Sequence, residues 1–270
     1  VLVYSGPGTT TESVKHTLES LRLHLSPHYA VIAVTESTII NEPWTFKTAM
    51  FVMPGGADLP MCKTLKGVGV KKITEYVKKG GKYAGFCAGG YFAAARCEFE
   101  VGTSMEVSGP RPLGFFPGTA RGCAYKGFNY ESHLGSRSVE LASNSCSPLL
   151  NYYNGGGIFV DADNYSNTQV LARYPDDTDV KEIGNAAVIL CSVGKGKALL
   201  AGTHPEFTTT LMKPQANDIP FIKTYEEMSA DPVFEHNRKI FLRDCLKELG
   251  LKVNESVEMS APKITPTYVG

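Results

Sequence analysis

The feature that most constrains the fold of this chain is a cysteine placed between glycines, where an apolar strand gives way to small residues. The segment reads Gly85-Phe86-Cys87-Ala88-Gly89 and follows Tyr83 and Ala84. Glycines two positions before and after the cysteine permit a tight strand-to-helix turn, the geometry of a nucleophile elbow. A lone cysteine of this kind is more often a buried core residue than a nucleophile, so a reactive role needs support from other residues.

Short apolar runs alternate with helical patterns on the N-terminal side of the elbow. The sequence predicts strands over Val1–Tyr4, Tyr29–Val34, Ala49–Met53 and Tyr83–Phe86, with an amphipathic helix over Val70–Lys79. This alternation is typical of a parallel sheet with helices on both faces, whose ligands gather at the carboxyl ends of the strands. We therefore predict a flavodoxin-like α/β fold with a mostly parallel sheet.

The second half of the chain is less regular. Glycine, proline and aromatic residues dominate residues 99–130, which predicts a loop and strand insertion that covers the site. Further strands are expected at Ser138–Leu141, Ile158–Asp161 and Val170–Tyr174, a hairpin at Ala187–Ala201, and helices near Tyr225 and over Phe234–Leu249. Residues 1–254 are expected to form one domain, and residues 255–270, with two prolines in a polar setting, a tail or linker.

A histidine and a glutamate follow the last predicted strand of the hairpin. His204-Pro205-Glu206 comes directly after Gly202 and Thr203. A cysteine that attacks an acyl carbon needs an imidazole to move the proton and a carboxylate to orient that imidazole. An isolated His-Pro-Glu is more often a surface loop, but its place beyond a buried strand of the same sheet favours a Cys87, His204 and Glu206 triad.

Two backbone segments are candidates for holding a developing oxyanion. Gly55 and Gly56 end the strand Ala49–Met53, and glycines let backbone amides approach a substrate carbonyl. The second donor is the amide of Ala88, directly after the nucleophile. Read alone, Pro-Gly-Gly is an ordinary turn; its value comes from its position beside the other two motifs.

Composition excludes several function classes. Lys+Arg and Asp+Glu balance at 27 each, so no overall charge draws the chain to nucleic acid or an anionic membrane. The seven cysteines form no metal-ligand pattern and no dense disulfide framework, and no apolar run is long enough to span a bilayer. We expect no metal and no cofactor, and a cytoplasmic setting.

The order of these motifs resembles class I glutamine amidotransferase-like domains, and more narrowly the N-terminal domain of fungal biotin-protein ligases. The resemblance runs from Val1 to about Leu249. It is carried by the motif segments Val3–Thr10, Pro54–Pro60, Gly85–Phe92, Met105–Gly109, Phe115–Thr119, Tyr153–Gly156, Phe159–Asp163 and His204–Phe207.

The resemblance implies the triad Cys87, His204 and Glu206, and it also has departures. Glutaminases of this class carry a glutamine four residues after the nucleophile, where this chain has Tyr91, which we assign to the substrate-binding set. Glutamine is therefore disfavoured as the substrate. The Gly-Arg-rich adenylate loop of biotin ligase catalytic domains is absent, so biotin transfer is not expected of these residues.

Three hypotheses follow. The first is a cysteine amidase or amidotransferase-like domain that acts on a small amide through a thioester, associated with a biotin ligase catalytic domain in cis or in trans. The second is a catalytically silent regulatory or binding domain that keeps the elbow for its shape, which Tyr91 favours. The third, a cysteine redox sensor, does not need the His-Pro-Glu segment and ranks below both.

Overall fold

Seven α-helices form in the part of the chain that the computed structural model describes, residues 1–181 and 184–256. The helices are α1 (Thr11–Leu25), α2 (Glu36–Asn41), α3 (Asp58–Leu65), α4 (Val68–Lys78), α5 (Ala88–Ala93), α6 (Ile219–Ser229) and α7 (Pro232–Glu248), with a 3-10 turn at Ala162–Asn164. Side chains start several of them: Thr10 accepts from the Ser13 amide at α1, and Asp231 accepts from the Val233 amide at α7.

The main sheet has nine strands in the order β2-β1-β3-β4-β13-β12-β11-β8-β9. They are β1 (Leu2–Tyr4), β2 (Ile32–Val34), β3 (Phe51–Met53), β4 (Lys82–Phe86), β8 (Arg137–Ser143), β9 (Leu149–Tyr153), β11 (Thr168–Arg173), β12 (Ala186–Val193) and β13 (Gly196–Ala201). The pairings from β2 to β13 are parallel, and those from β13 to β9 are antiparallel. The strand order brings the ends of β3, β4 and β13 to neighbouring positions.

The predicted insertion is a second sheet. Its four strands, in the order β10-β7-β5-β6, are β5 (Ala94–Phe99), β6 (Val107–Pro110), β7 (Phe116–Gly122) and β10 (Ile158–Phe159). In the chain, β5 comes first and begins at Ala94, directly after α5. The second sheet therefore starts before residue 99, where the sequence pattern changes. Ile158–Asp161, predicted as a strand, contributes two residues to this sheet rather than to the main one.

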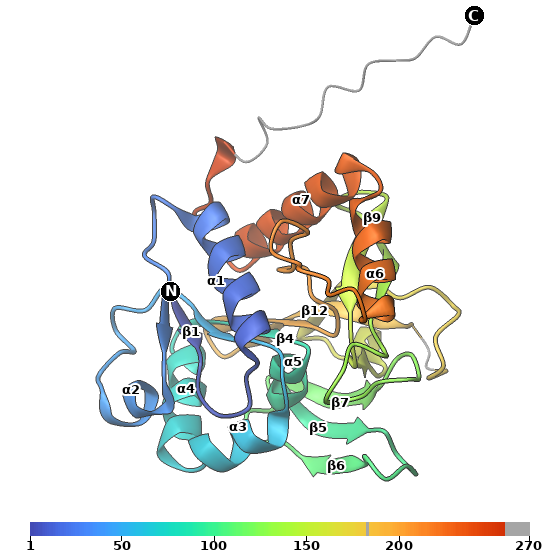
Figure 1. The fold of residues 1–270 in the computed structure, drawn as a ribbon. Coiled ribbons are helices and arrows are strands. Elements are labelled where there is room, and N and C mark those ends of the chain that lie inside the picture. The colour runs from blue at the N-terminus through green and yellow to red at the C-terminus, as the bar shows by residue number, and fades with distance from the viewer. Residues whose placement is uncertain (182–183, 257–270) are drawn as a thin grey trace, which may run out of the picture.

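Helices cover both faces of the main sheet (Figure 1), as alternation along its strands requires. Val3 and Val52 face one core, where Leu21 of α1 and Phe241 of α7 are also buried. The alternate residues of these strands face the other core, which holds Met61 of α3 and the apolar side of α4. The two layers fix α5, and therefore the elbow, at the carboxyl edge of the sheet.

The α/β fold with helices on both faces is confirmed, and so is the hairpin, in which Val193 pairs with Gly196. The parallel order holds for one half of the sheet only, because β11, β8 and β9 join it antiparallel. Several short elements, among them α2, α3, β5 and β9, are not predicted by the sequence pattern. Most of the expected tail, residues 257–270, lies outside the described residues.

Candidate active site

Cys87 occupies a strained turn between β4 and α5. Its φ of 49° and ψ of −106° place a non-glycine residue in a region that favours glycine. The turn is held from both sides, because the Cys87 amide donates to Ala201 O at 2.8 Å and Cys87 O accepts from the Tyr91 amide at 3.1 Å. A Cβ on Gly89 would lie 2.0 Å from Met53 O, so only glycine lets α5 approach β3 this closely. The predicted elbow is present.

His204 and Glu206 lie together just beyond β13. His204 Nδ1 is 2.8 Å from Glu206 Oε1, and the two residues are 4% and 0% exposed. The main chain of His204 is fixed as well, since its amide donates to Tyr152 O at 2.9 Å. The carboxylate contacts Nδ1 of His204, so the interaction with Cys87 falls to the other ring nitrogen.

The electrostatics of His204 link it to both other members of the predicted triad. Burial alone would lower the pKa of this imidazole, but the Glu206 carboxylate and the Cys87 side chain raise that pKa to about 10. Both neighbours favour the protonated form of the ring. Cys87 and Glu206 thus interact with the same imidazole ring.

The Gly55-Gly56 loop closes the site from the end of β3. Gly56 has a φ of +147°, and a Cβ on it would lie 1.9 Å from Gly8 O, so no other residue fits there. Among the described residues, neither the Gly56 amide nor the Ala88 amide donates a hydrogen bond to a protein acceptor. Both donors are thus available, as an oxyanion hole requires.

An open cleft of about 1150 Å³ joins these residues to solvent. Gly56, Cys87 and His204 line it, together with the first turn of α1 and the loop around residues 128–134. Glu206 lies behind His204 and does not line the cleft. The cleft is large enough for a small-molecule ligand, and such concave sites are where ligands usually bind.

Tyr91 is not at the cleft surface. Its ring is buried and packs edge-on against Phe99, and its hydroxyl donates to Gly155 O at 3.2 Å. The side chain of Tyr91 therefore ties α5 to the loop after β9. The position that carries glutamine in glutaminases is used here for packing.

Sequence reasoning missed an aromatic wall beside His204. Phe207 stacks on His16 at 3.9 Å and on Tyr152 at 4.5 Å between ring centroids, and Phe221 meets Tyr152 edge-on. These rings come from α1, β9, the loop after β13 and α6. Only Phe207, next to the His-Pro-Glu segment, carried a local signal; the other three are brought together by the tertiary fold.

A second missed cluster lies at the mouth of the cleft. His133 Nδ1 is 2.5 Å from Asp218 Oδ2, and His133 Nε2 is 3.4 Å from Glu12 Oε2. Its ring also stacks on Phe221 at 4.2 Å. Both ring nitrogens are engaged, so His133 acts as a clasp between the 128–134 loop, α1 and the start of α6.

The described residues hold no group of metal ligands and no helix that could span a membrane. Within residues 1–181 and 184–256, no three or more His, Cys, Asp or Glu side chains group in a way that could hold a metal ion. Asp163, which follows β10, pairs with Arg173 at 2.7 Å instead. None of the described helices has the length and apolar character needed to cross a membrane.

Two relatives resemble the chain along most of its length. A biotin-protein ligase from Schizosaccharomyces pombe is 39% identical over 275 residues, covering 100% of this chain and 41% of the ligase. The chain thus spans less than half of that relative. An uncharacterized protein from Chlamydia muridarum is 34% identical over 223 residues, covering 81% of this chain and 85% of that protein.

Solved structures with the same fold include a glutamine amidotransferase and PurLQS from Thermotoga maritima. The first matches with a TM-score of 0.51 at 15% identity, covering 84% of this chain and 99% of the other. The second matches with a TM-score of 0.54 at 12% identity, covering 92% and 97%. At these identities the likeness shows the fold alone. The model of the family described as biotin-protein ligase, N terminal, matches residues 1–270, and the chain therefore belongs to this family, with a glutamine amidotransferase-like fold.

Proposed function

We propose that this domain is a cysteine amidase that acts on a small carboxamide through a thioester. The observation that carries the proposal is the position of His204, whose ring interacts with Glu206 on one side and with Cys87 on the other. A nucleophile, a base and an orienting carboxylate in that order make up a hydrolytic triad. The cleft gives a substrate access to Cys87.

Each step of the proposed reaction uses groups of this chain and one water molecule. The Cys87 thiolate attacks the amide carbon, and the amides of Gly56 and Ala88 stabilise the oxyanion that forms. The C–N bond then breaks, and His204 gives its proton to the leaving nitrogen, which departs as ammonia or an amine. Water, deprotonated by His204, hydrolyses the thioester, releases the carboxylic acid and restores Cys87. No cofactor enters any step.

The substrate proposed is a small amide other than glutamine. Tyr91 stands in place of the glutamine found in glutaminases and is committed to packing. The wall formed by Phe207, Tyr152 and Phe221 offers apolar contact to the part of the substrate that does not react.

Ammonia release from a panel of small primary amides tests the proposal. We expect release by the unaltered protein and none by Cys87→Ala, while Cys97→Ala, which removes a buried cysteine outside the cleft, retains activity. Release that is equal and at background level for all three proteins would rule out the amidase.

The alternative function is a catalytically silent regulatory or ligand-binding domain of a cytoplasmic biotin-protein ligase, with a ligase catalytic domain as its partner in cis or in trans. The coverage of only 41% of the S. pombe ligase favours it, because the remainder of that protein leaves room for a ligase domain. Titration of a separately purified biotin ligase catalytic domain with this chain tests the contact. Binding that persists in Cys87→Ala, without ammonia release by either protein, would favour this function over the amidase.

A further inference from the structure

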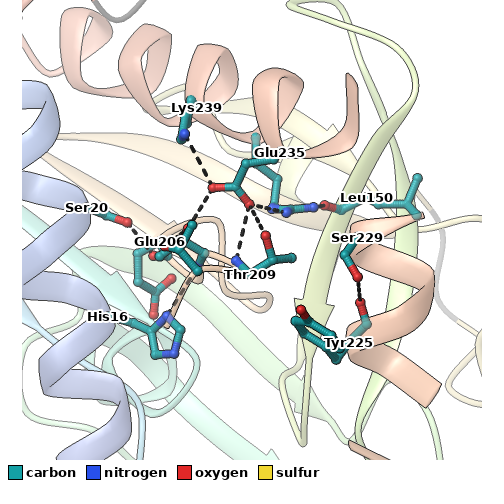
Figure 2. A network of polar contacts seen from close by, with 12 residues as sticks. His16, Ser20, Leu150, Glu206, Thr209, Tyr225, Ser229, Glu235 and Lys239 are labelled. Atoms are coloured by element: carbon teal, nitrogen blue, oxygen red, sulfur yellow. Dashed lines mark hydrogen bonds and ion pairs between the residues drawn. The ribbon is translucent and has the colours of Figure 1, made fainter. Parts of the chain in front are cut away.

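Two helices, in addition to strand β9, hold the loop that carries His204 and Glu206. From α1, Ser20 Oγ donates to Glu206 O at 2.5 Å, and His16 Nδ1 accepts from the Thr208 amide at 3.1 Å. From α7, Glu235 accepts three hydrogen bonds from the loop: one from the Thr208 hydroxyl at 2.7 Å, and two from the Thr209 amide and hydroxyl at 3.2 and 3.1 Å. Figure 2 shows Glu235 at the centre of this network.

Glu235 carries a partly buried charge that faces two cations, Arg238 and, 3.6 Å away, Lys239. Its side chain is 18% exposed, and the partner, Arg238, is 1% exposed as a residue and lies 2.5 Å away. Burial alone would raise the pKa of Glu235, but Arg238 and the hydrogen bonds from the loop lower it to about 2. A carboxylate that stays ionised makes stronger hydrogen bonds to the loop than a neutral group could.

The same network also contacts β9, the strand whose Tyr152 carbonyl accepts from the His204 amide. Arg238 Nη1 donates to Leu150 O at 3.0 Å, two residues before Tyr152 in β9. The carbonyl of Tyr152 accepts from the His204 amide, so β9 supports the loop both directly and through Arg238 and Glu235. His204 thus lies in a connected network of polar contacts. Within residues 1–181 and 184–256, the side-chain hydrogen bonds that join α7 to the loop are those of Glu235.

We propose that Glu235 is a positioning residue that holds the loop 204–209 so that the His204 imidazole faces Cys87. The inference rests on the proposed function, since it assigns Glu235 a role in the same Cys87, His204 and Glu206 site. Glu235 does not line the cleft. Its effect on chemistry passes through Thr208 and Thr209 to His204.

The test measures how fast iodoacetamide alkylates Cys87 as a function of pH, followed by mass spectrometry of the peptide that contains Cys87. The readout needs no substrate, and it responds to the imidazole beside the thiol. His204→Gln gives the profile without that imidazole. We expect Glu235→Gln to shift the pH profile toward that of His204→Gln. Alkylation at pH 7 should slow about tenfold, which is the lower end of the loss seen at metal sites when a residue that orients a ligand side chain is removed.

Two variants on α7 are the controls. Glu248→Gln removes an exposed carboxylate from the same helix, and Leu246→Ala removes a buried core side chain without touching the loop. Both should keep the unaltered pH profile, although Leu246→Ala lowers the melting temperature. Glu235→Asp, which keeps the charge, should recover part of the loss.

Each other outcome overturns the inference. An unaltered profile for Glu235→Gln would show that the loop holds its position without Glu235. Equal shifts in Glu235→Gln and Leu246→Ala would mean that reactivity follows stability alone. If His204→Gln left the profile unchanged, the proposed triad would be ruled out together with the inference. A shift in His204→Gln without one in Glu235→Gln would rule out the inference alone.

Discussion

A Cβ atom on Gly55 would lie 2.6 Å from Cε1 of His204, so the imidazole packs directly against the backbone of the loop after β3. The same atom would lie 2.8 Å from Ser13 Oγ. The loop that supplies the predicted oxyanion donor therefore also sets the position of the predicted base. The absence of a side chain at Gly55 is a requirement of the site and not only of the turn.

Gly55→Ala is expected to displace His204 while the fold remains. Overpacking of this kind costs about 1–3 kcal/mol, which a domain of this size tolerates. Alkylation of Cys87 at pH 7 should fall to the rate seen in His204→Gln, with a cooperative thermal transition retained. Adding Ser13→Ala relieves only the hydroxyl contact, so the double variant should stay impaired. Recovery of alkylation in the double variant would contradict this account.

The sequence predicts the parts of the site that are local in the chain. Cys87 and its flanking glycines, the Gly55-Gly56 turn and the adjacent His204 and Glu206 all carry short patterns with a direct geometric meaning. The α/β alternation then places these three segments at neighbouring strand ends, because parallel strands share a carboxyl edge.

The rest depends on contacts that no local pattern encodes. His133 meets Glu12 and Asp218 across sequence separations of 121 and 85 residues, and Glu235 reaches Thr208 only through the docking of α7. Tyr91 was assigned to the substrate because of its spacing from Cys87, but its hydroxyl is bound to Gly155 O. Spacing identifies a position on α5; the neighbouring loops decide what that position does.

Stability should fall as the pH rises through the titration of His204. Its pKa is raised from an ordinary value of 6.5 to about 10, so its contribution to folding is fully present below pH 6.5 and is lost as the pH rises through about 10. The free energy of unfolding, measured in urea between pH 6 and 10, should therefore decline more in the unaltered protein than in His204→Gln. Parallel declines in the two proteins would show that His204 does not gain a proton on folding.

A buried ion pair joins the second sheet to α3. Arg111 Nε donates to Asp58 Oδ2, and the two side chains are 3% and 11% exposed. Arg111→Leu leaves the Asp58 charge without its partner, and breaking such a pair costs about 3–5 kcal/mol. Urea unfolding should show this loss, and adding Asp58→Asn should restore much of it. As the matched control, Arg22→Leu breaks a pair with Glu19 that is about half exposed, and should cost under about 1 kcal/mol.

The His133 clasp should make stability depend on pH in a lower window than His204 does. Hydrogen bonds to Glu12 and Asp218 raise the pKa of His133 from 6.5 to about 8, against the effect of burial. The clasp therefore contributes fully below pH 6.5, and its contribution is lost as the pH rises through about 8.

Between pH 6 and 9 the unaltered protein should lose about 1 kcal/mol more stability than His133→Gln, a figure that allows for solvent screening at a side chain 30% exposed. The exposed His28 provides a control, since His28→Gln leaves the clasp intact and should follow the unaltered protein. Protonated His133 donates one hydrogen bond to Asp218 and one to Glu12. Glu12→Gln should therefore remove part of the same pH dependence. A Glu12→Gln protein whose pH dependence matches that of the unaltered protein would show that Asp218 alone holds the proton on His133.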